Sequence, residues 1–199
     1  MFTENKLLLN HKWDFEGITI SDKGLQNVIS LTPILVPTSM GRHEHKKFAK
    51  ARVNIVERLV NKLMHFGHKY AKNSGRMGGK KSKAINIVLT ALEIVHLKTG
   101  GNPIEYLVKA VENTAPNEDT TRIGYGGVVY HVSVDISPLR RVDLALRFLA
   151  LGVRETSFSM QKGVEEILAD EILACANNDT SGFAIRKKNE QERVAMLSR

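Results

Sequence analysis

The sequence predicts a mainly α-helical fold: a single helical-bundle domain of about six helices, with one protruding β-hairpin and an extended N-terminal arm. Three observations predict it. Most of the chain after residue 41 carries apolar residues at helical spacing. One pair of β-prone runs meets at Gly126-Gly127. The first 41 residues hold only short apolar pieces. We therefore divide the chain into an arm, residues 1–41, and a helical domain, residues 42–199, with the hairpin at about 120–136.

The arm is expected to dock on the helical body through two aromatic side chains. Its apolar pieces, Ile18 to Ile20 and Val28 to Val36, are broken by glycines and prolines and predict extended chain. Trp13 and Phe15 are the anchors, and we favour hydrophobic packing over base stacking for both. The run from Leu7 to Leu9 is too short for a signal peptide or a membrane span, so we expect a soluble intracellular protein.

A long basic helix follows the arm. Apolar residues recur at helical spacing from Val56 to Met64, and the polar residues between them are expected to face away from the core. Those polar residues are Glu57, Arg58, Asn61 and Lys62. The approach to this helix, Arg42 to Arg52, is densely cationic.

The positive charge of the chain is concentrated in one region. The formal net charge is +8 and the pI about 9.6, which points to a polyanionic partner or an acidic surface. From Arg42 to Lys83 there are thirteen Lys and Arg against two Glu, whereas Glu155 to Ile185 holds six acids and one lysine. A basic part beside an acidic part indicates a binder with a fixed orientation.

A basic, glycine-rich loop within Lys69 to Lys83 invites comparison with a nucleotide-binding P-loop. That motif needs a glycine five positions before its Gly-Lys pair and a Ser or Thr directly after the lysine. Ser74 and Lys81 occupy those places, so the pattern fails and an enzyme with a nucleotide substrate is disfavoured. Glycines among cations favour close approach of the backbone to a large polyanion, and we predict contact with a phosphate backbone.

Two further helices are predicted next. The first has an apolar stripe from Ile85 to Val95 and ends before Gly100-Gly101. The second opens with Asn102-Pro103, an N-cap and a proline at the first helical position, and Glu105 completes a capping box. Such a helix pair could read DNA, but the second helix offers only Lys109 among acidic residues, so we favour simple packing.

The hairpin lies in the stretch from Asp119 to Arg141. Gly126-Gly127 supplies the positive φ angles of a two-residue turn. The alternation of side chains after the turn places one set of residues on each face. One face carries Val128, Tyr130, Val132, Val134 and Ile136, and the other carries Val129, His131, Ser133 and Asp135. Ser137-Pro138 starts a helix that is expected to end at Gly152. Because a lone hairpin is marginal in water, this one must contact helices or a partner.

Two more helices complete the bundle. One has an apolar stripe from Val164 to Cys175. The other is the basic C-terminal helix, Arg186 to Arg199, in which Val194 and Leu197 are expected to point inward.

No arrangement typical of an enzyme, a metal site or a cofactor site is found in the sequence. Cys175, the single cysteine, excludes an internal disulfide, and its place on an apolar stripe predicts a buried, inert thiol. The histidine pairs, His43 with His45 and His65 with His68, lack a third ligand.

Four motifs, in order along the chain, resemble a known family. They are Ile55–Leu59 (IVERL), Thr121–Gly127 (TRIGYGG), Val134–Arg141 (VDISPLRR) and Ala184–Lys188 (AIRKK). They are similar to motifs of the small-subunit ribosomal protein family S seven in its archaeal version, akin to the eukaryotic protein S five. The resemblance runs from about Thr38 to the C-terminus, and residues 1–37 resemble the arm of archaeal and eukaryotic members more loosely.

The resemblance implies a structural constituent of the small ribosomal subunit in the cytoplasm. Members of the family bind a multi-helix junction in the 3′ major domain of the small-subunit rRNA and organise head assembly. Their hairpin lies near the exit-site tRNA and the mRNA path. Implied protein partners are neighbours in the head and platform, of the S nine and S eleven families. No enzymatic activity, cofactor, metal ion or membrane is implied.

By position, the resemblance assigns three groups of residues. The rRNA-binding group is Arg42, His43, His45, Lys46, Lys47, Lys50, Arg52, Arg76, Lys80, Lys81, Lys83, Arg122, Arg140 and Arg141. The hairpin tip toward tRNA and mRNA is Tyr125, Gly126, Gly127, Tyr130 and His131. The basic C-terminal helix contributes Arg186, Lys187, Lys188 and Arg193. The chain departs from the family in two places, since many members carry arginines at the hairpin tip and have a shorter loop at 73–79.

The residues themselves favour a structural RNA binder. Cations spread over a helix, a loop and the base of a hairpin fit a folded RNA junction better than the periodic grooves of duplex DNA. The alternative is a DNA-binding architectural or regulatory protein, which would prefer duplex DNA over folded RNA at matched salt.

Overall fold

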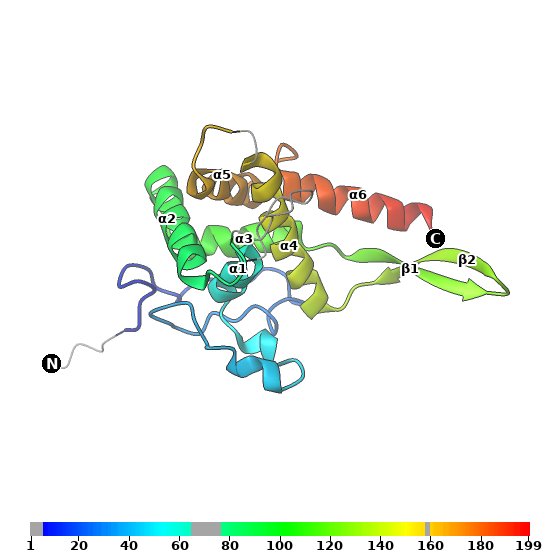
Figure 1. Cartoon of the computed structure of the whole chain (residues 1–199), viewed down its shortest axis with the longest axis horizontal. Helices are drawn as coiled ribbons and strands as arrows, with labels where there is room; N and C mark the ends of the chain where they lie inside the picture. The colour runs from blue at the N-terminus through cyan, green and yellow to red at the C-terminus, as the bar shows by residue number, and fades with distance from the viewer. Residues whose placement is uncertain (1–5, 65–76, 158–159) are drawn as a thin grey trace.

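The described part of the chain contains six α-helices and one β-hairpin, as predicted, together with two short 3₁₀ turns. The computed structural model describes residues 6–64, 77–157 and 160–199. The helices are α1 (Ile55–Leu63), α2 (Lys81–Thr99), α3 (Pro103–Thr114), α4 (Pro138–Ser157), α5 (Val164–Ala176) and α6 (Phe183–Leu197). The strands are β1 (Glu118–Tyr125) and β2 (Val128–Asp135), paired antiparallel. The helices gather into one body, from which the hairpin extends to one side (Figure 1).

The end of α2 and the start of α3 lie at the capping residues that the sequence predicts. α2 ends at Gly100, which has a left-handed φ of 70°. α3 begins where the Asn102 carboxamide oxygen accepts a hydrogen bond at 3.1 Å from a backbone N–H of the first turn, with Pro103 at the first helical position. The expected capping box does not form, because the Glu105 carboxylate accepts a hydrogen bond from Lys109 at 2.8 Å instead.

α5 packs against several other helices of the body. It packs against α2, α3 and α4, and the stripe that includes Ile167, Leu168 and Ile172 is buried. Cys175 on the same stripe is buried as predicted. Burial raises the pKa of its thiol well above the usual range, and the nearby Glu171 carboxylate raises it further. The thiol therefore stays protonated at neutral pH, which makes it a poor nucleophile.

The arm docks on the helical body through buried side chains. Trp13 and Phe15 are buried, which confirms them as hydrophobic anchors, and they belong to the same cluster as the helical stripes. Other arm residues in this cluster are Leu9, Leu25 and Ile29. Between residues 6 and 41 the chain has turns and isolated bridges and no α-helix, so the extended character of its described part is as predicted.

The hairpin has the predicted turn and faces. Gly126-Gly127 has φ angles of 59° and 83°, the left-handed values that the turn requires. Arg122 pairs across the strands with His131, and Ile123 with Tyr130, so the first pair lies on one face of the hairpin and the second pair on the other. Nearly all of β2 is exposed on both faces.

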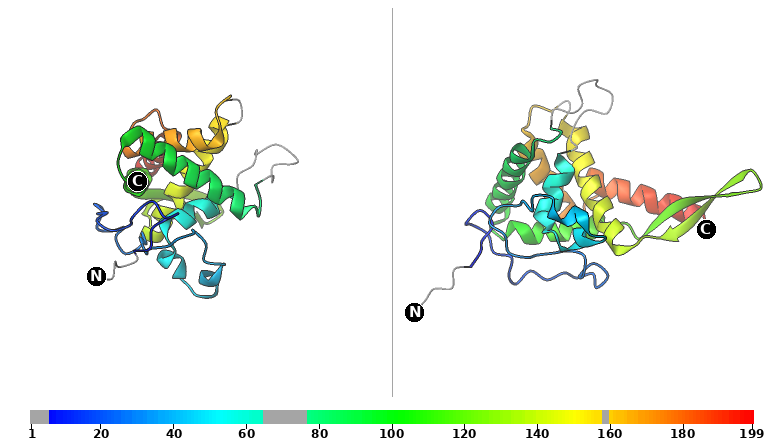
Figure 2. Two further views of the ribbon diagram at one scale, coloured as in Figure 1. Left: turned by 90° about the vertical axis from the view of Figure 1, so that its left-hand side faces the viewer. Right: turned by 60° about the horizontal axis from the view of Figure 1, so that its bottom comes forward.

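α6 supports the base of the hairpin and leaves its outer part exposed. The backbone N–H of Asn117 donates to the Glu192 carboxylate at 3.0 Å, and Arg199 pairs with Glu118. Figure 2 shows α6 beside the strands near their base, with the turn projecting well beyond the body. Because a two-stranded ribbon is marginal alone, the outer hairpin suits contact with a partner.

α4 continues past Gly152, where the sequence predicted its end, and reaches Ser157. A Cβ at Gly152 would lie 2.9 Å from Oε1 of Glu171 and 3.1 Å from Cβ of Phe183. Glycine here permits close packing of α4 against α5 and α6 and does not end the helix. The predicted boundary is therefore wrong.

The predicted orientation of two α1 residues is also wrong. Glu57 and Arg58 are buried and do not face away from the core. Each meets an opposite charge from a distant part of the chain, Lys81 for Glu57 and Asp143 for Arg58. Buried charges are tolerated in proteins when they are paired and hydrogen-bonded in this way.

The last turns of α6 also differ from the prediction. Val194 and Leu197 are exposed, whereas Ala195 between them is buried. The end of the helix runs beyond the core and along the hairpin, so its larger apolar side chains have no core to enter (Figure 1).

Two features of other protein classes do not occur in the described part of the chain. No helix of these residues is both long and apolar enough to cross a bilayer. No three or more His, Cys, Asp or Glu side chains among them are placed to hold a metal ion. His65 and His68 lie outside the described residues.

Candidate nucleic-acid interface

Most of the cations assigned to RNA contact are exposed. Those that are exposed and form no ion pair with another described residue are Arg42, His45, Lys46, Lys47, Arg52, Lys80, Lys83, Arg122, Arg186 and Arg193. An exposed cation without a counter-charge on its own chain is suited to neutralising a phosphate. Arg76 lies outside the described residues.

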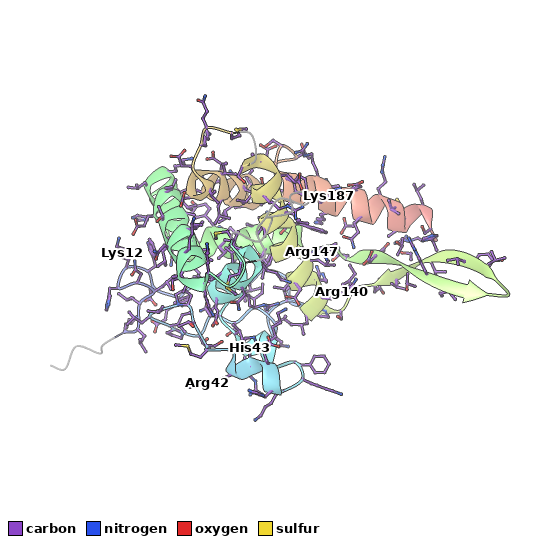
Figure 3. The ribbon with its side chains drawn as sticks, viewed as in Figure 1. Lys12, Arg42, His43, Arg140, Arg147 and Lys187 are labelled. Carbon is purple, nitrogen blue, oxygen red and sulfur yellow. The ribbon has the colours of Figure 1, made fainter. Side chains whose placement is uncertain are left out.

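The cationic approach to α1 folds into two 3₁₀ turns, Arg42–His45 and Ala49–Arg52. Each turn is preceded by a residue with a left-handed backbone, Gly41 at φ 73° and Phe48 at φ 60°. Figure 3 labels Arg42 and His43 on this segment, at the edge of the molecule opposite α5 and α6. Most cations of this segment are exposed, whereas Lys50 turns inward to Asp143.

An open pocket of about 550 Å³ lies between this segment and the start of α2. Its lining includes four cations: Lys50, Arg58, Lys62 and Lys81. Three of the predicted site residues, His43, Lys50 and Lys81, line this pocket. The structure thus brings together predicted residues that are far apart in the sequence.

Asp143 of α4 organises three of these cations. Its carboxylate lies 2.9 Å from Lys50, 3.3 Å from Arg58 and 3.9 Å from Lys62. Burial alone would raise the pKa of the Asp143 carboxyl, but the hydrogen bond from Lys50 and the surrounding positive charges outweigh it and hold that pKa below its usual value. Burial, joined by the charges of its cationic neighbours, lowers the pKa of the Lys62 ammonium, and Asp143 offsets this only in part.

A second hydrogen-bonded group fixes the other side of the pocket. The buried Glu57 carboxylate accepts hydrogen bonds from Lys81 at 2.7 Å and from the backbone N–H and hydroxyl of Ser39 at 2.8 Å each. Burial would raise the pKa of Glu57, but these donors outweigh it and lower that pKa. His43 joins Ser39 at 3.1 Å and Glu44 at 2.9 Å. Because the Ser39 hydroxyl donates to Glu57, it is not arranged as a nucleophile activated by His43.

Arg140 and Arg141 have different roles although they are adjacent. The Arg140 side chain is 64% exposed and reaches Asp119 only at 3.4 Å. The Arg141 side chain is 14% exposed, pairs with Asp22 at 2.9 Å and donates to the carbonyl of Pro116 at 3.2 Å. Arg140 is therefore available to a partner, whereas Arg141 ties the arm to the base of the hairpin.

Three cations near the pocket were not among the predicted site residues. Arg58 and Lys62 were expected only to face away from the core, and the third cation is Arg147 of α4, whose charge acts on Lys62. The Arg147 side chain is exposed, and Figure 3 shows it on the same helix as Arg140. The spacing of Arg140, Asp143 and Arg147 at i, i+3 and i+7 could have revealed a charged face on this helix.

The hairpin tip and the C-terminal helix hold the remaining predicted residues. Tyr130, His131 and the Gly126-Gly127 turn are exposed, and Tyr125 ends β1. Lys187 pairs with Glu190 at 2.6 Å, and Lys188 donates to the carbonyl of Asn113 at 2.9 Å. These two lysines therefore have internal partners, in contrast to Arg186 and Arg193 on the same helix.

The helix pair α2–α3 lacks the character of a DNA-reading module. Lys109 of α3 pairs with Glu105 at 2.8 Å and lies 5.8 Å from the centre of the Tyr106 ring. The single lysine of α3 is therefore engaged on its own helix, next to carboxylates that would repel phosphate.

A family model and three known proteins similar to this chain agree with one another. Residues 26–199 match the family described as "Ribosomal protein S7p/S5e". The small ribosomal subunit protein uS7 of Cenarchaeum symbiosum is 60% identical over 197 residues, covering 99% of this chain and 98% of the relative. Proteins of the same name from Methanosphaera stadtmanae and Methanothermobacter thermautotrophicus are 51% and 50% identical, covering 92% and 94% of this chain and 94% and 97% of their own lengths. These matches show that the protein has a structural, non-enzymatic role in the small ribosomal subunit. The chain belongs to the ribosomal protein S7p/S5e family.

Proposed function

We propose that this protein binds a multi-helix junction in the 3′ major domain of the small-subunit rRNA and organises assembly of the head of the subunit. The observation that carries the proposal is the placement of exposed, unpaired cations on separate elements: the segment Arg42–Arg52, the start of α2, the hairpin and α6. A folded junction presents phosphates from several directions and is recognised largely through shape and backbone.

The hairpin and α6 fit the other neighbours expected for such a protein. We propose that the exposed tip, with Tyr130 and His131, lies near the exit-site tRNA and the mRNA path of the cytoplasmic ribosome. The end of α6 exposes Val194, Met196 and Leu197 beside basic residues, which suits a neighbouring protein of the S nine or S eleven family. An outer hairpin without support from its own chain agrees with a place among partners.

A chemical footprint on small-subunit rRNA from the same source tests the proposal, with duplex DNA as competitor and salt varied. Protection of one junction in the 3′ domain that survives DNA competition would support it. If about six phosphates are neutralised, the logarithm of affinity should fall with the logarithm of salt at a slope of about −4 to −5. Equal competition by duplex DNA, with no discrete footprint, would overturn it.

Arg140→Ala and Arg141→Ala are expected to separate RNA binding from folding. Arg140→Ala should weaken rRNA binding by about three- to tenfold and leave stability unchanged, because its exposed guanidinium has only a long contact with Asp119. Arg141→Ala should lower the free energy of unfolding by about 1–3 kcal/mol, because Asp22 loses its cation and Pro116 its donor. Filter binding and urea denaturation measure the two effects. A greater stability loss for Arg140→Ala than for Arg141→Ala would contradict the assignment.

A further inference from the structure

Phe48 combines two features that the fold itself disfavours. Its side chain is 78% exposed, so the ring forgoes the stabilisation of hydrophobic burial. Its backbone has a φ of 60°, a left-handed value that bulky side chains rarely adopt. Strained residues of this kind are found disproportionately at functional sites.

The turn around Phe48 holds the ring outward. Phe48 is the N-cap of the second 3₁₀ turn, and its carbonyl accepts a hydrogen bond from the backbone N–H of Ala51 at 3.1 Å. The N–H of Ala49 donates to the carbonyl of Lys46 at 3.3 Å. The left-handed corner between the two turns is thus fixed on both sides, and the ring is presented by a defined backbone.

Cations flank Phe48 along the chain. Lys46, Lys47 and Arg52 are exposed and form no ion pair with a described residue, and Lys50 reaches back to Asp143 at 2.9 Å. An aromatic face among ammonium and guanidinium groups suits an RNA strand, because the ring stacks on a base while the cations neutralise neighbouring phosphates. Only an unpaired base offers such a face, since bases within a helix are covered by their neighbours.

We infer that Phe48 stacks on an unpaired base of the small-subunit rRNA, with Lys46 and Lys47 contacting the phosphates that flank it. The inference rests on the proposed function and adds a base contact to an interface otherwise made of phosphate contacts. Phe48 would therefore fix the register of the segment Arg42–Arg52 on the RNA, because a stacked base defines one nucleotide.

Three variants of Phe48 test the stacking. Phe48→Tyr keeps an aromatic face and should bind the 3′-domain rRNA within about twofold of the unchanged protein. Phe48→Leu keeps an apolar side chain without the face, and Phe48→Asn tolerates the left-handed backbone; both should weaken binding by about 5- to 150-fold. The salt slope should stay unchanged in all three, whereas Lys47→Ala should reduce its magnitude by about 0.7–0.9. Leu97→Ala, at an equally exposed apolar position on α2, is the control and should bind normally.

Ultraviolet crosslinking of the complex adds a direct readout. After trypsin and nuclease digestion, the peptide that begins at Phe48 should carry one nucleotide, and Phe48→Leu should lose it. Unchanged affinity for Phe48→Leu and Phe48→Asn would overturn the inference. So would normal rRNA affinity combined with poor incorporation into subunits, which would indicate that the ring meets a neighbouring protein. Failure of the unchanged protein to bind the 3′-domain rRNA refutes the proposed function instead, so the two failures are distinguishable.

Discussion

Replacing Asp143 with alanine is expected to lower the free energy of unfolding by about 3–5 kcal/mol. The reason is Arg58, whose side chain is 1% exposed and which meets Asp143 at 3.3 Å. Without the carboxylate, the guanidinium would stay buried, and the carbonyl of Val28 at 2.9 Å would be its remaining partner among the described residues. Lys50 and Lys62 would also lose the carboxylate that they share with it. Urea denaturation followed by circular dichroism measures the loss.

Asp170→Ala provides the matched control. Asp170 also pairs with two lysines, Lys98 and Lys162, but all three side chains are exposed. Surface ion pairs contribute little, so this variant should lose less than about 1 kcal/mol. Similar losses for Asp143→Ala and Asp170→Ala would show that burial of Arg58 does not set the cost.

The pH dependence of stability should also depend on Asp143. Its ordinary pKa is 3.8, and the folded value lies lower because the neighbouring cations outweigh the effect of burial. A carboxyl with a depressed folded pKa stabilises the native state above its unfolded pKa, and this contribution is lost as the pH falls through the folded pKa. From about pH 4 downward, the protein should therefore lose stability more steeply than Asp143→Asn. Parallel acid profiles for the two proteins would contradict this.

Elements set by local chemistry were predictable from sequence, and elements set by distant contacts were not. The cap at Asn102 and the turn at Gly126-Gly127 depend on a few adjacent residues. Arg58 enters the core because a carboxylate 85 positions away meets it there. Gly152 has the local signature of a helix end, yet it serves the approach of α5 and α6.

The candidate interface shows the same division. The high content of Lys and Arg in Arg42–Arg52 can be recognised from the sequence. Its 3₁₀ turns and the exposed ring of Phe48 depend on backbone angles that composition does not specify. Arg140 and Arg141 are adjacent residues of the same type, so the sequence does not reveal that their roles differ. Their roles differ because Asp22, which lies 119 positions away in the sequence, accepts a hydrogen bond from Arg141.

Replacing Trp13 with alanine is expected to lower the free energy of unfolding by about 3–5 kcal/mol, although Trp13 lies in the arm. Its side chain is 7% exposed and belongs to the same core cluster as the helical stripes. Removal of the indole would leave a cavity shared by arm and body. Leu7→Ala, at an exposed position of the same arm, should change stability by no more than about 0.5 kcal/mol. Circular dichroism in urea measures both variants.

The same tryptophan reports whether the arm is docked before assembly, because it is the single tryptophan of the chain. Besides the buried anchors, the arm is bound by the Asn54 carboxamide, which donates to Thr32 at 2.8 Å, and by the pair between Asp22 and Arg141 at 2.9 Å. Arm and body should therefore unfold together, with Trp13 fluorescence and helical circular dichroism changing at the same urea concentration. A fluorescence change that precedes loss of the helices would mean that the arm undocks by itself, and that the proposed division at residue 41 separates two folding units. Coincident changes would mean that the arm shapes the base of the hairpin, through Arg141, before any RNA is bound.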